Sequence, residues 1–193
     1  MTPSIPSTRW TCQTRWTHHL TPLGRMLLAA DDRGVVGAWF DGDKHVHGPD
    51  EAWHRDDGDA LLVQVAAQLD DWFAGRRRGF DLPLAPRGTD FQQAVWREIA
   101  RVGWGDTRSY GEVATAIGRP RAVRAVGAAT GRNPLTLIVP CHRLLGRDGA
   151  LTGFASGLDR KRALLAFEAG APLLWQAQAP GQATLAEVVE GCA

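Results

Sequence analysis

The sequence lacks long hydrophobic runs. Although 44% of its 193 residues are hydrophobic, charged residues interrupt every apolar stretch within a few positions, and a membrane-spanning helix needs about 20 consecutive apolar residues. The first residues, MTPSIPSTRW, contain no apolar core of the length that a signal peptide requires. We therefore expect a cytoplasmic protein with no membrane association.

Cysteine is also scarce. Cys12, Cys141 and Cys192 are widely spaced and form no CxxC pair, which argues against a disulfide framework and against a cysteine-rich zinc site. The histidines at 18–19 and 45–47 lack a convincing set of further ligands. We expect no metal and no other cofactor.

Excess charge of one sign occurs only locally. The net charge is +1 overall, but residues 1–88 carry 10 basic and 12 acidic residues, residues 89–170 carry 12 basic and 7 acidic residues, and residues 171–193 add two acidic residues. A basic segment beside acidic ones indicates an anionic partner for that segment, and nucleic acid is one candidate.

The first part of the chain has the pattern of a small sheet with one helix. The apolar runs at 25–30 and 34–40 predict two strands of a hairpin, and the polar residues 41–58 predict a loop. Apolar residues at helical spacing predict a helix over 59–74. Because Pro and Gly then mark a boundary, we expect an N-terminal sheet-plus-helix domain at residues 1–87.

The second part has a helical pattern. Thr89 or Asp90 can cap a helix that runs through Ala100, and Ser109 with Glu112 has the spacing of a capping box for a second helix. A further helix is predicted from Pro120 to Gly131, and a last one over 159–170. Two short helices joined by a tight turn are typical of a helix-turn-helix. The fold class is α/β, with a mostly helical domain at residues 88–175 and a C-terminal tail at 176–193.

The segment 135–146 carries the candidate chemistry. It is a hydrophobic, strand-like run that stops at Pro140 and presents Cys141, His142 and Arg143. A thiol becomes a strong nucleophile only when it is ionised, so a neighbouring base is expected. His142 is one candidate for that base, and Glu168 could hold its tautomer. An inert buried cysteine beside a surface histidine remains the alternative.

The run from Phe91 to Gly170 resembles a known family. It contains the motifs SYGE, RAVGAA, GRNP, IVPCHR and LTGF, followed by GLDRKRALLAFE. Together these motifs resemble the catalytic domain of the O6-alkylguanine-DNA alkyltransferases, the methylated-DNA–protein-cysteine methyltransferase family. The first 85 residues resemble that family's N-terminal domain more loosely, through TPLGRMLLAADDRGVVGAWF.

The resemblance implies a catalytic set. Cys141 resembles the alkyl acceptor, His142 the base that deprotonates it through a water, and Glu168 the carboxylate that orients this histidine. Asn133 resembles the residue that ties the recognition helix to the active-site segment. Tyr110 resembles the tyrosine that crowds the 3′ phosphate of the target nucleotide and can hydrogen-bond ring N3.

The resemblance also implies a DNA-binding surface. Arg124 resembles the arginine that fills the gap left by a flipped nucleotide, which is needed because O6 of guanine lies inside the duplex. Ala125 and Gly127 keep one helix face small enough to approach the minor groove, which carries little sequence information. Arg121 and Arg132 are expected to contact phosphates. The expected partner is double-stranded DNA with alkylated bases, bound by a monomer that can bind cooperatively.

The substrate pocket departs from the family pattern. Leu144, Phe154, Ala155 and Ser156 are its expected residues, and Ala155 retains the backbone N–H that the family uses to bind O6 but lacks a polar side chain. Some members hold zinc in the N-terminal domain, but Asp31 occupies the position of one zinc-ligand cysteine here.

The implied function is direct-reversal repair of O6-alkylguanine, and of O4-alkylthymine, with one turnover per protein because no residue is placed to hydrolyse the thioether. Three other functions are open: a damage sensor without transfer, a transcription regulator, and a cysteine hydrolase. The retained Cys141 argues against the sensor, the absence of a second regulatory domain argues against the regulator, and Arg124 has no purpose in a hydrolase.

Overall fold

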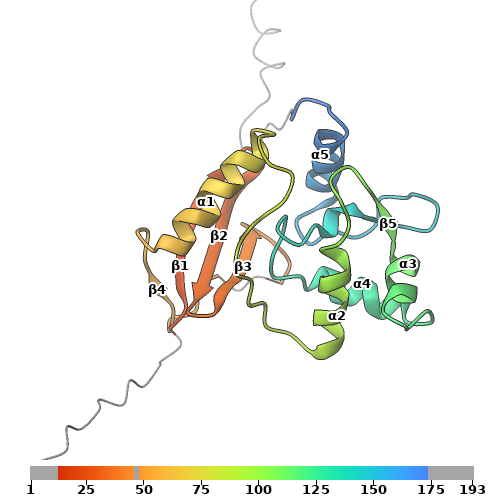
Figure 1. The fold of residues 1–193 in the computed structure, drawn as a ribbon, viewed down its shortest axis with the longest axis horizontal. Coiled ribbons are helices and arrows are strands. Elements are labelled where there is room, and N and C mark those ends of the chain that lie inside the picture. Colours follow the sequence, from red (N-terminus) through yellow and green to blue (C-terminus); the bar gives the residue numbers. More distant parts are fainter. Residues whose placement is uncertain (1–12, 46–47, 174–193) are drawn as a thin grey trace, which may run out of the picture.

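The computed structural model describes residues 13–45 and 48–173. A sheet covered by one helix is followed by a mostly helical part that lies beyond the edge strand β3 (Figure 1). This arrangement confirms the α/β fold class and the predicted order of its two parts. The tail 176–193, Cys12 and Cys192 lie outside the described residues. Within the described ranges, no helix is long and apolar enough to cross a membrane.

The sheet has four strands in the order β3-β2-β1-β4. The strands β1 (Arg15–Thr21), β2 (Gly24–Asp31) and β3 (Gly34–Phe40) are antiparallel neighbours, and β4 (His54–Arg55) pairs in parallel with β1. The predicted hairpin is confirmed as β2 and β3. The sequence did not indicate β1, because most of its side chains are polar and none is fully buried. The short strand β4 lies inside the predicted loop 41–58.

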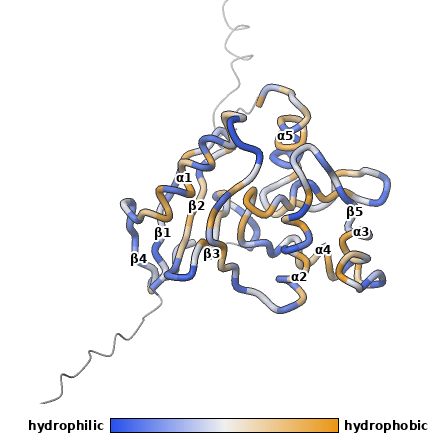
Figure 2. The backbone as a smooth tube through the Cα atoms, in the orientation of Figure 1, coloured by the Kyte–Doolittle hydropathy of each residue, from blue (hydrophilic) through white to orange (hydrophobic). Residues whose placement is uncertain are grey.

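The helix α1 (Ala60–Phe73) packs against this sheet, as predicted. Its N-terminus is capped by Asp59, whose carboxylate accepts hydrogen bonds from the first backbone N–H groups of the helix. The buried face includes Leu62, Leu69 and Trp72. Figure 2 shows hydrophobic stretches toward the middle of the molecule and hydrophilic outer loops.

The free edge of β3 carries two later segments of the chain. Val35 donates its N–H to the carbonyl of Pro83 at 2.8 Å. Further along the strand, Ala38 donates to Pro134 at 2.8 Å and accepts from Thr136 at 2.9 Å. The edge of the N-terminal sheet therefore holds the linker and the segment that precedes Cys141.

The helical part confirms the predicted helices with small shifts at their ends. Capping boxes are present at Thr89 and at Ser109. The third helix begins at Val123, so the predicted start at Pro120 is wrong; residues 119–122 instead form a turn in which Ala122 donates to Arg119 at 2.8 Å. The four helices are α2 (Asp90–Ile99), α3 (Tyr110–Ala116), α4 (Val123–Gly131) and α5 (Leu158–Glu168).

The segment 135–140 is not a strand, although its sequence is strand-like. It makes only isolated bridges and folds back on itself, with Val139 donating to Leu135 at 2.8 Å, and Leu137 has a positive φ of 73°. It is apolar because it is buried on all sides: Leu135 and Leu137 are 0% and 1% exposed. Such complete burial does not distinguish a strand from an irregular core segment.

A short parallel ladder brings α3 next to the cysteine. The strands β5 (Arg108–Ser109) and β6 (Leu144–Leu145) pair with each other. Tyr110 follows β5 directly, and β6 follows the 3₁₀ turn η1 (Cys141–Arg143). The ladder therefore fixes Tyr110 beside the cysteine turn.

Candidate functional site

Cys141 begins the 3₁₀ turn and is only 5% exposed. Its Sγ accepts a hydrogen bond from Nδ2 of Asn133 at 3.3 Å. Burial raises the pKa of the Cys141 thiol to about 11, and the hydrogen bond from Asn133 opposes this rise only in part. The thiol is therefore protonated at neutral pH, and its activation requires a base.

Asn133 follows α4 and holds the segment that leads to the cysteine. Its Nδ2 donates to the carbonyl of Val139 at 2.9 Å, and its Oδ1 accepts from the N–H of Leu135 at 3.0 Å. One buried amide thus joins both ends of the irregular segment to the thiol.

His142 is fully buried, and its Nε2 lies 2.9 Å from Oε1 of Glu168. Because a carboxylate only accepts hydrogen bonds, this contact places the ring proton on Nε2 and leaves a lone pair on Nδ1. Nδ1 is buried and has no hydrogen-bond partner among the described residues. Burial lowers the pKa of His142, so the imidazole is neutral and can accept a proton.

Glu168 has a second partner that the sequence interpretation did not assign. Nε of Arg143 donates to Oε2 at 2.9 Å, and Nη2 donates to Oε1 at 2.8 Å. The N–H of Gly105 also donates to Oε2, at 3.2 Å. Burial opposes the charge of Glu168, but hydrogen bonds from His142 and Arg143 outweigh it and lower the pKa of Glu168 to about 2. The only sequence signal for Arg143 is its place in the motif IVPCHR.

Aromatic rings pack beside the buried cluster of His142, Arg143 and Glu168. The Trp72 ring lies 6.3 Å from the His142 ring and meets it edge to face. Trp104 and Phe167 pack on Trp72 at 5.1 and 5.4 Å between ring centroids. Trp72 belongs to α1, so the N-terminal part supplies one wall around the histidine.

Lys161 is a further residue that the sequence interpretation did not assign. Its Nζ is buried and donates to the carbonyls of Leu144 at 2.5 Å and Thr152 at 2.7 Å. These contacts join both ends of the loop that leads from the cysteine turn toward Phe154. Burial lowers the pKa of Lys161 to about 8.

Tyr110 lies against the same loop. Its hydroxyl is 3.3 Å from the carbonyl oxygens of both Thr152 and Gly153, and its ring centroid is 5.9 Å from Nζ of Lys161. Burial raises the pKa of Tyr110, so its hydroxyl remains a donor at neutral pH.

A hollow of about 440 Å³ opens between this loop and α4. It brings together five of the predicted site residues: Tyr110, Arg124, Gly127, Phe154 and Ala155. The other two pocket candidates, Leu144 and Ser156, are 0% and 6% exposed and do not line it.

The predicted DNA-facing residues lie on α4 or at its two ends, and most of them are exposed. On α4, Arg124 and Ala125 are exposed, and a Cβ added to Gly127 would meet no atom within 4 Å. Arg121 precedes the helix, Arg132 follows it, and both are exposed.

Asp31 is buried and forms ion pairs with two arginines. Its Oδ2 accepts from Arg33 at 3.1 Å and from Arg87 at 3.0 Å. Although burial opposes its charge, these hydrogen bonds and one from the backbone of Arg33 lower the pKa of Asp31 to about 2. Over residues 13–45 and 48–173, no group of three His, Cys, Asp or Glu side chains is arranged to hold a metal ion.

Comparison with known proteins identifies both parts of the chain. Residues 14–86 match the family described as "6-O-methylguanine DNA methyltransferase, ribonuclease-like domain", and residues 90–170 match "6-O-methylguanine DNA methyltransferase, DNA binding domain".

Individual relatives agree. A methylated-DNA–protein-cysteine methyltransferase of Methanosarcina barkeri is 46% identical over 149 residues, which are 77% of this chain and 92% of that protein. One from Mycobacterium tuberculosis is 51% identical over 133 residues, which are 69% of this chain and 75% of that protein. The crystal structure of M. tuberculosis OGT in complex with DNA superimposes with a TM-score of 0.74 and 41% identity, covering 83% of this chain and 95% of that one. The chain therefore belongs to the methylated-DNA–protein-cysteine methyltransferase family of DNA repair proteins and contains both of that family's domains.

Proposed function

We propose that Cys141 removes an alkyl group from O6 of guanine in double-stranded DNA and keeps it. The observation that carries this proposal is the buried hydrogen bond between Glu168 and His142, the residue that follows Cys141 in the same 3₁₀ turn. A neutral imidazole with a free lone pair is the base that a thiol of pKa about 11 needs.

The transfer proceeds in one displacement. The thiol proton passes through a water to Nδ1 of His142, and the sulfur attacks the alkyl carbon. The C–S bond forms as the bond between this carbon and O6 breaks, and the electron pair of the broken bond stays on the guanine. The N–H of Ala155 stabilises O6, and the hydroxyl of Tyr110 hydrogen-bonds ring N3 as charge develops there.

The target base must leave the helix before it can react. The helix-turn-helix of α3 and α4 binds in the minor groove, and Arg124 enters the base stack in place of the flipped nucleotide. Flipping costs roughly a few kcal/mol, and filling the vacancy offsets part of that cost. The exposed Arg121 and Arg132 contact phosphates. Arg132 directly follows the last residue of α4.

The same pocket accepts O4-alkylthymine, because that lesion also presents an alkylated exocyclic oxygen next to a ring nitrogen. The thioether formed on Cys141 is stable, so each protein molecule acts once. The protein acts as a monomer that can bind cooperatively along DNA.

Intact mass spectrometry after incubation with a duplex that carries O6-methylguanine tests this function. We expect repair to saturate at one lesion per protein, with a mass gain of one methyl group in place of one hydrogen, located on Cys141. Cys141→Ala should abolish transfer and retain DNA binding. Repeated turnover, or repair by Cys141→Ala, would refute the mechanism.

A further inference from the structure

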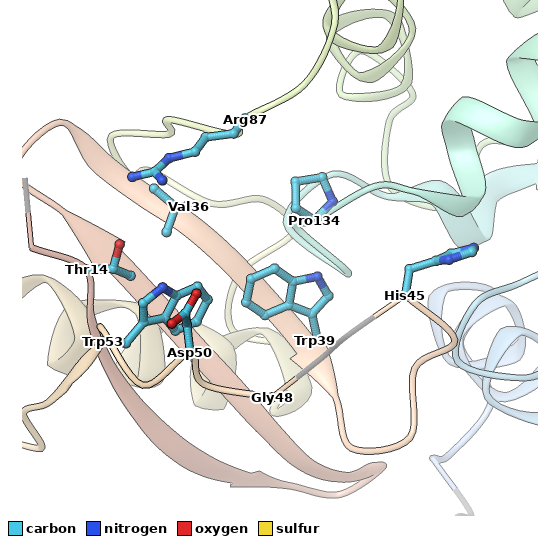
Figure 3. A pocket seen from close by; sticks show the side chains of 9 residues that line it. All are labelled: Thr14, Val36, Trp39, His45, Gly48, Asp50, Trp53, Arg87 and Pro134. Atoms are coloured by element: carbon cyan, nitrogen blue, oxygen red, sulfur yellow. The ribbon is translucent and has the colours of Figure 1, made fainter.

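A hollow of about 510 Å³ is lined mostly by residues of the N-terminal part of the molecule, and none of its lining residues belongs to the alkyl-acceptor site (Figure 3). Its walls include two tryptophans, Trp39 on β3 and Trp53 in the segment before β4. Figure 3 shows the two indoles next to each other, with Asp50 close to Trp53. Neither ring belongs to the buried core of the described residues.

The two indoles form a stacked platform. Their ring centroids are 6.3 Å apart and their planes differ by 23°. The Trp39 ring lies over Gly37, where an added Cβ would come within 1.7 Å of the ring. Gly37 therefore allows a large aromatic ring to lie flat on the strand while remaining half exposed.

Neighbouring hollows connect this one to the surface of α4. A second hollow of about 330 Å³ shares Trp39, Arg87 and Pro134 with it. The second hollow also shares Gly131 and Ala155 with the hollow above Tyr110 and Arg124. The three hollows are therefore neighbours, and together they define a path over the surface from α4 to the two tryptophans, with His45 in the wall of each.

Basic side chains follow this path. Arg124, Arg132 and Arg87 line successive hollows, and all three are exposed. Arg87 contacts Asp31 through Nη2, and its side chain remains 58% exposed, so it can still reach a second anion. A basic path that ends at an aromatic platform is the pattern that binds single-stranded nucleic acid, whose backbone follows the cations while its bases stack on the rings.

We propose that this path binds single-stranded DNA, with the phosphates on Arg132 and Arg87 and an unpaired base stacked on Trp53. The charges of the lining residues orient the nucleotide. The carboxylate of Asp50, beside the rings, repels a phosphate but can accept a hydrogen bond from a base N–H, so the base and not the phosphate lies at the tryptophans. Duplex DNA does not fit this platform, because its base faces are covered within the stack. The proposal rests on DNA lying against α4, as in the proposed function, but it requires no alkyl transfer.

Fluorine NMR tests the contact directly. The full chain is labelled with 5-fluorotryptophan and titrated with a lesion-free oligothymidylate, and the signals of the three tryptophans that are followed are assigned from Trp39→Phe, Trp53→Phe and Trp72→Phe. We expect the signals of Trp39 and Trp53 to shift with the oligonucleotide and the signal of the buried Trp72 to stay unchanged. Unshifted Trp39 and Trp53 signals at saturating oligonucleotide would overturn the proposal.

Affinity measurements with variants test the energetics. Trp53→Ala should weaken binding of the single strand by roughly 5- to 150-fold, the range for one base stacked on an aromatic ring. Trp53→Phe should retain most of the affinity. Arg87→Gln should reduce the salt dependence of single-strand binding, whereas Arg76→Gln, at an exposed ion pair with Asp71, should not.

Measurements with duplex DNA distinguish a binding role of Trp53 from a structural role. Binding of lesion-free duplex and the alkylation rate of Cys141 on a methylated duplex should be unchanged in Trp53→Ala. An unchanged single-strand affinity, or an equal loss on single strand and duplex, would overturn the proposal. Failure of the proposed repair function would show separately, as wild-type protein that binds DNA without gaining a methyl group.

Discussion

Arg143 and Glu168 form a two-point ion pair in the interior of the protein, with N–O distances of 2.9 and 2.8 Å and side chains that are 6% and 1% exposed. The same carboxylate accepts a hydrogen bond from His142. Arg143 therefore keeps Glu168 charged and turned toward the histidine. It is a positioning residue, since it acts through Glu168 and not on the substrate.

Removing this arginine should leave a buried charge without its partner. We expect Arg143→Met to lower the free energy of unfolding by about 3–5 kcal/mol, as for other broken buried pairs. Chemical denaturation measures the change. Arg162→Met is a matched control, because the ion pair of Arg162 with Asp159 is exposed and should contribute less than about 1 kcal/mol. Equal losses in the two variants would contradict this account of Arg143.

The Glu168→Gln variant tests the proton relay. The amide can donate a hydrogen bond to Nε2, which favours the tautomer with its proton on Nδ1 and removes the base. We expect single-turnover alkylation of Cys141 to slow by about 100-fold or more, with little change in DNA affinity. Glu112→Gln serves as the control, since Glu112 is an exposed helix-capping residue. An unchanged transfer rate in Glu168→Gln would indicate a thiol that reacts without the relay.

Glu168 also predicts how stability depends on pH. Its pKa falls from an ordinary 4.5 to about 2 in the folded protein, so the unfolded chain binds the proton more tightly. The stabilisation is present above pH 4.5 and is lost as the pH falls toward 2. Thermal unfolding across this range should show a shallower loss in Glu168→Gln than in wild type. Parallel curves would mean that Glu168 is not ionised in the fold.

Arg124 should act on the flipped state of a duplex and not on the chemistry. If filling the vacancy contributes about 1–3 kcal/mol, Arg124→Ala should slow alkylation by a duplex lesion by roughly 10- to 100-fold. The reaction with free O6-benzylguanine, which has no base stack, should hardly change. Second-order rates of Cys141 alkylation on both substrates measure the difference.

Two further arginines provide the comparison for that experiment. Arg121→Ala and Arg132→Ala should weaken binding to all DNA and flatten its salt dependence, because they remove phosphate contacts. If Arg124→Ala slowed alkylation equally on duplex and free base, the role of Arg124 would instead be to support the structure of the pocket.

Local signals in the sequence are sufficient to predict that the helices exist, and to place the starts of those with a capping side chain, but not the start of α4. Thr89 and Ser109 cap helices through residues three positions away, so their patterns can be read directly. The segment before Cys141 was mistaken for a strand because its conformation depends on Asn133 and on the distant Ala38. The contacts of Arg143 and Lys161 likewise depend on partners that only the tertiary fold brings close.

The pairing of Pro83 and Thr136 with β3 has an additional consequence for the isolated sheet. An open strand edge presents unpaired N–H and C=O groups that can join to another chain. Here the linker and the segment before the cysteine occupy that edge, and the opposite edge ends in the two-residue strand β4. A fragment limited to residues 1–87 would uncover the edge at Ala38 and would be prone to self-association. The segment before the catalytic cysteine therefore also protects the N-terminal sheet from pairing with the strand edge of another chain.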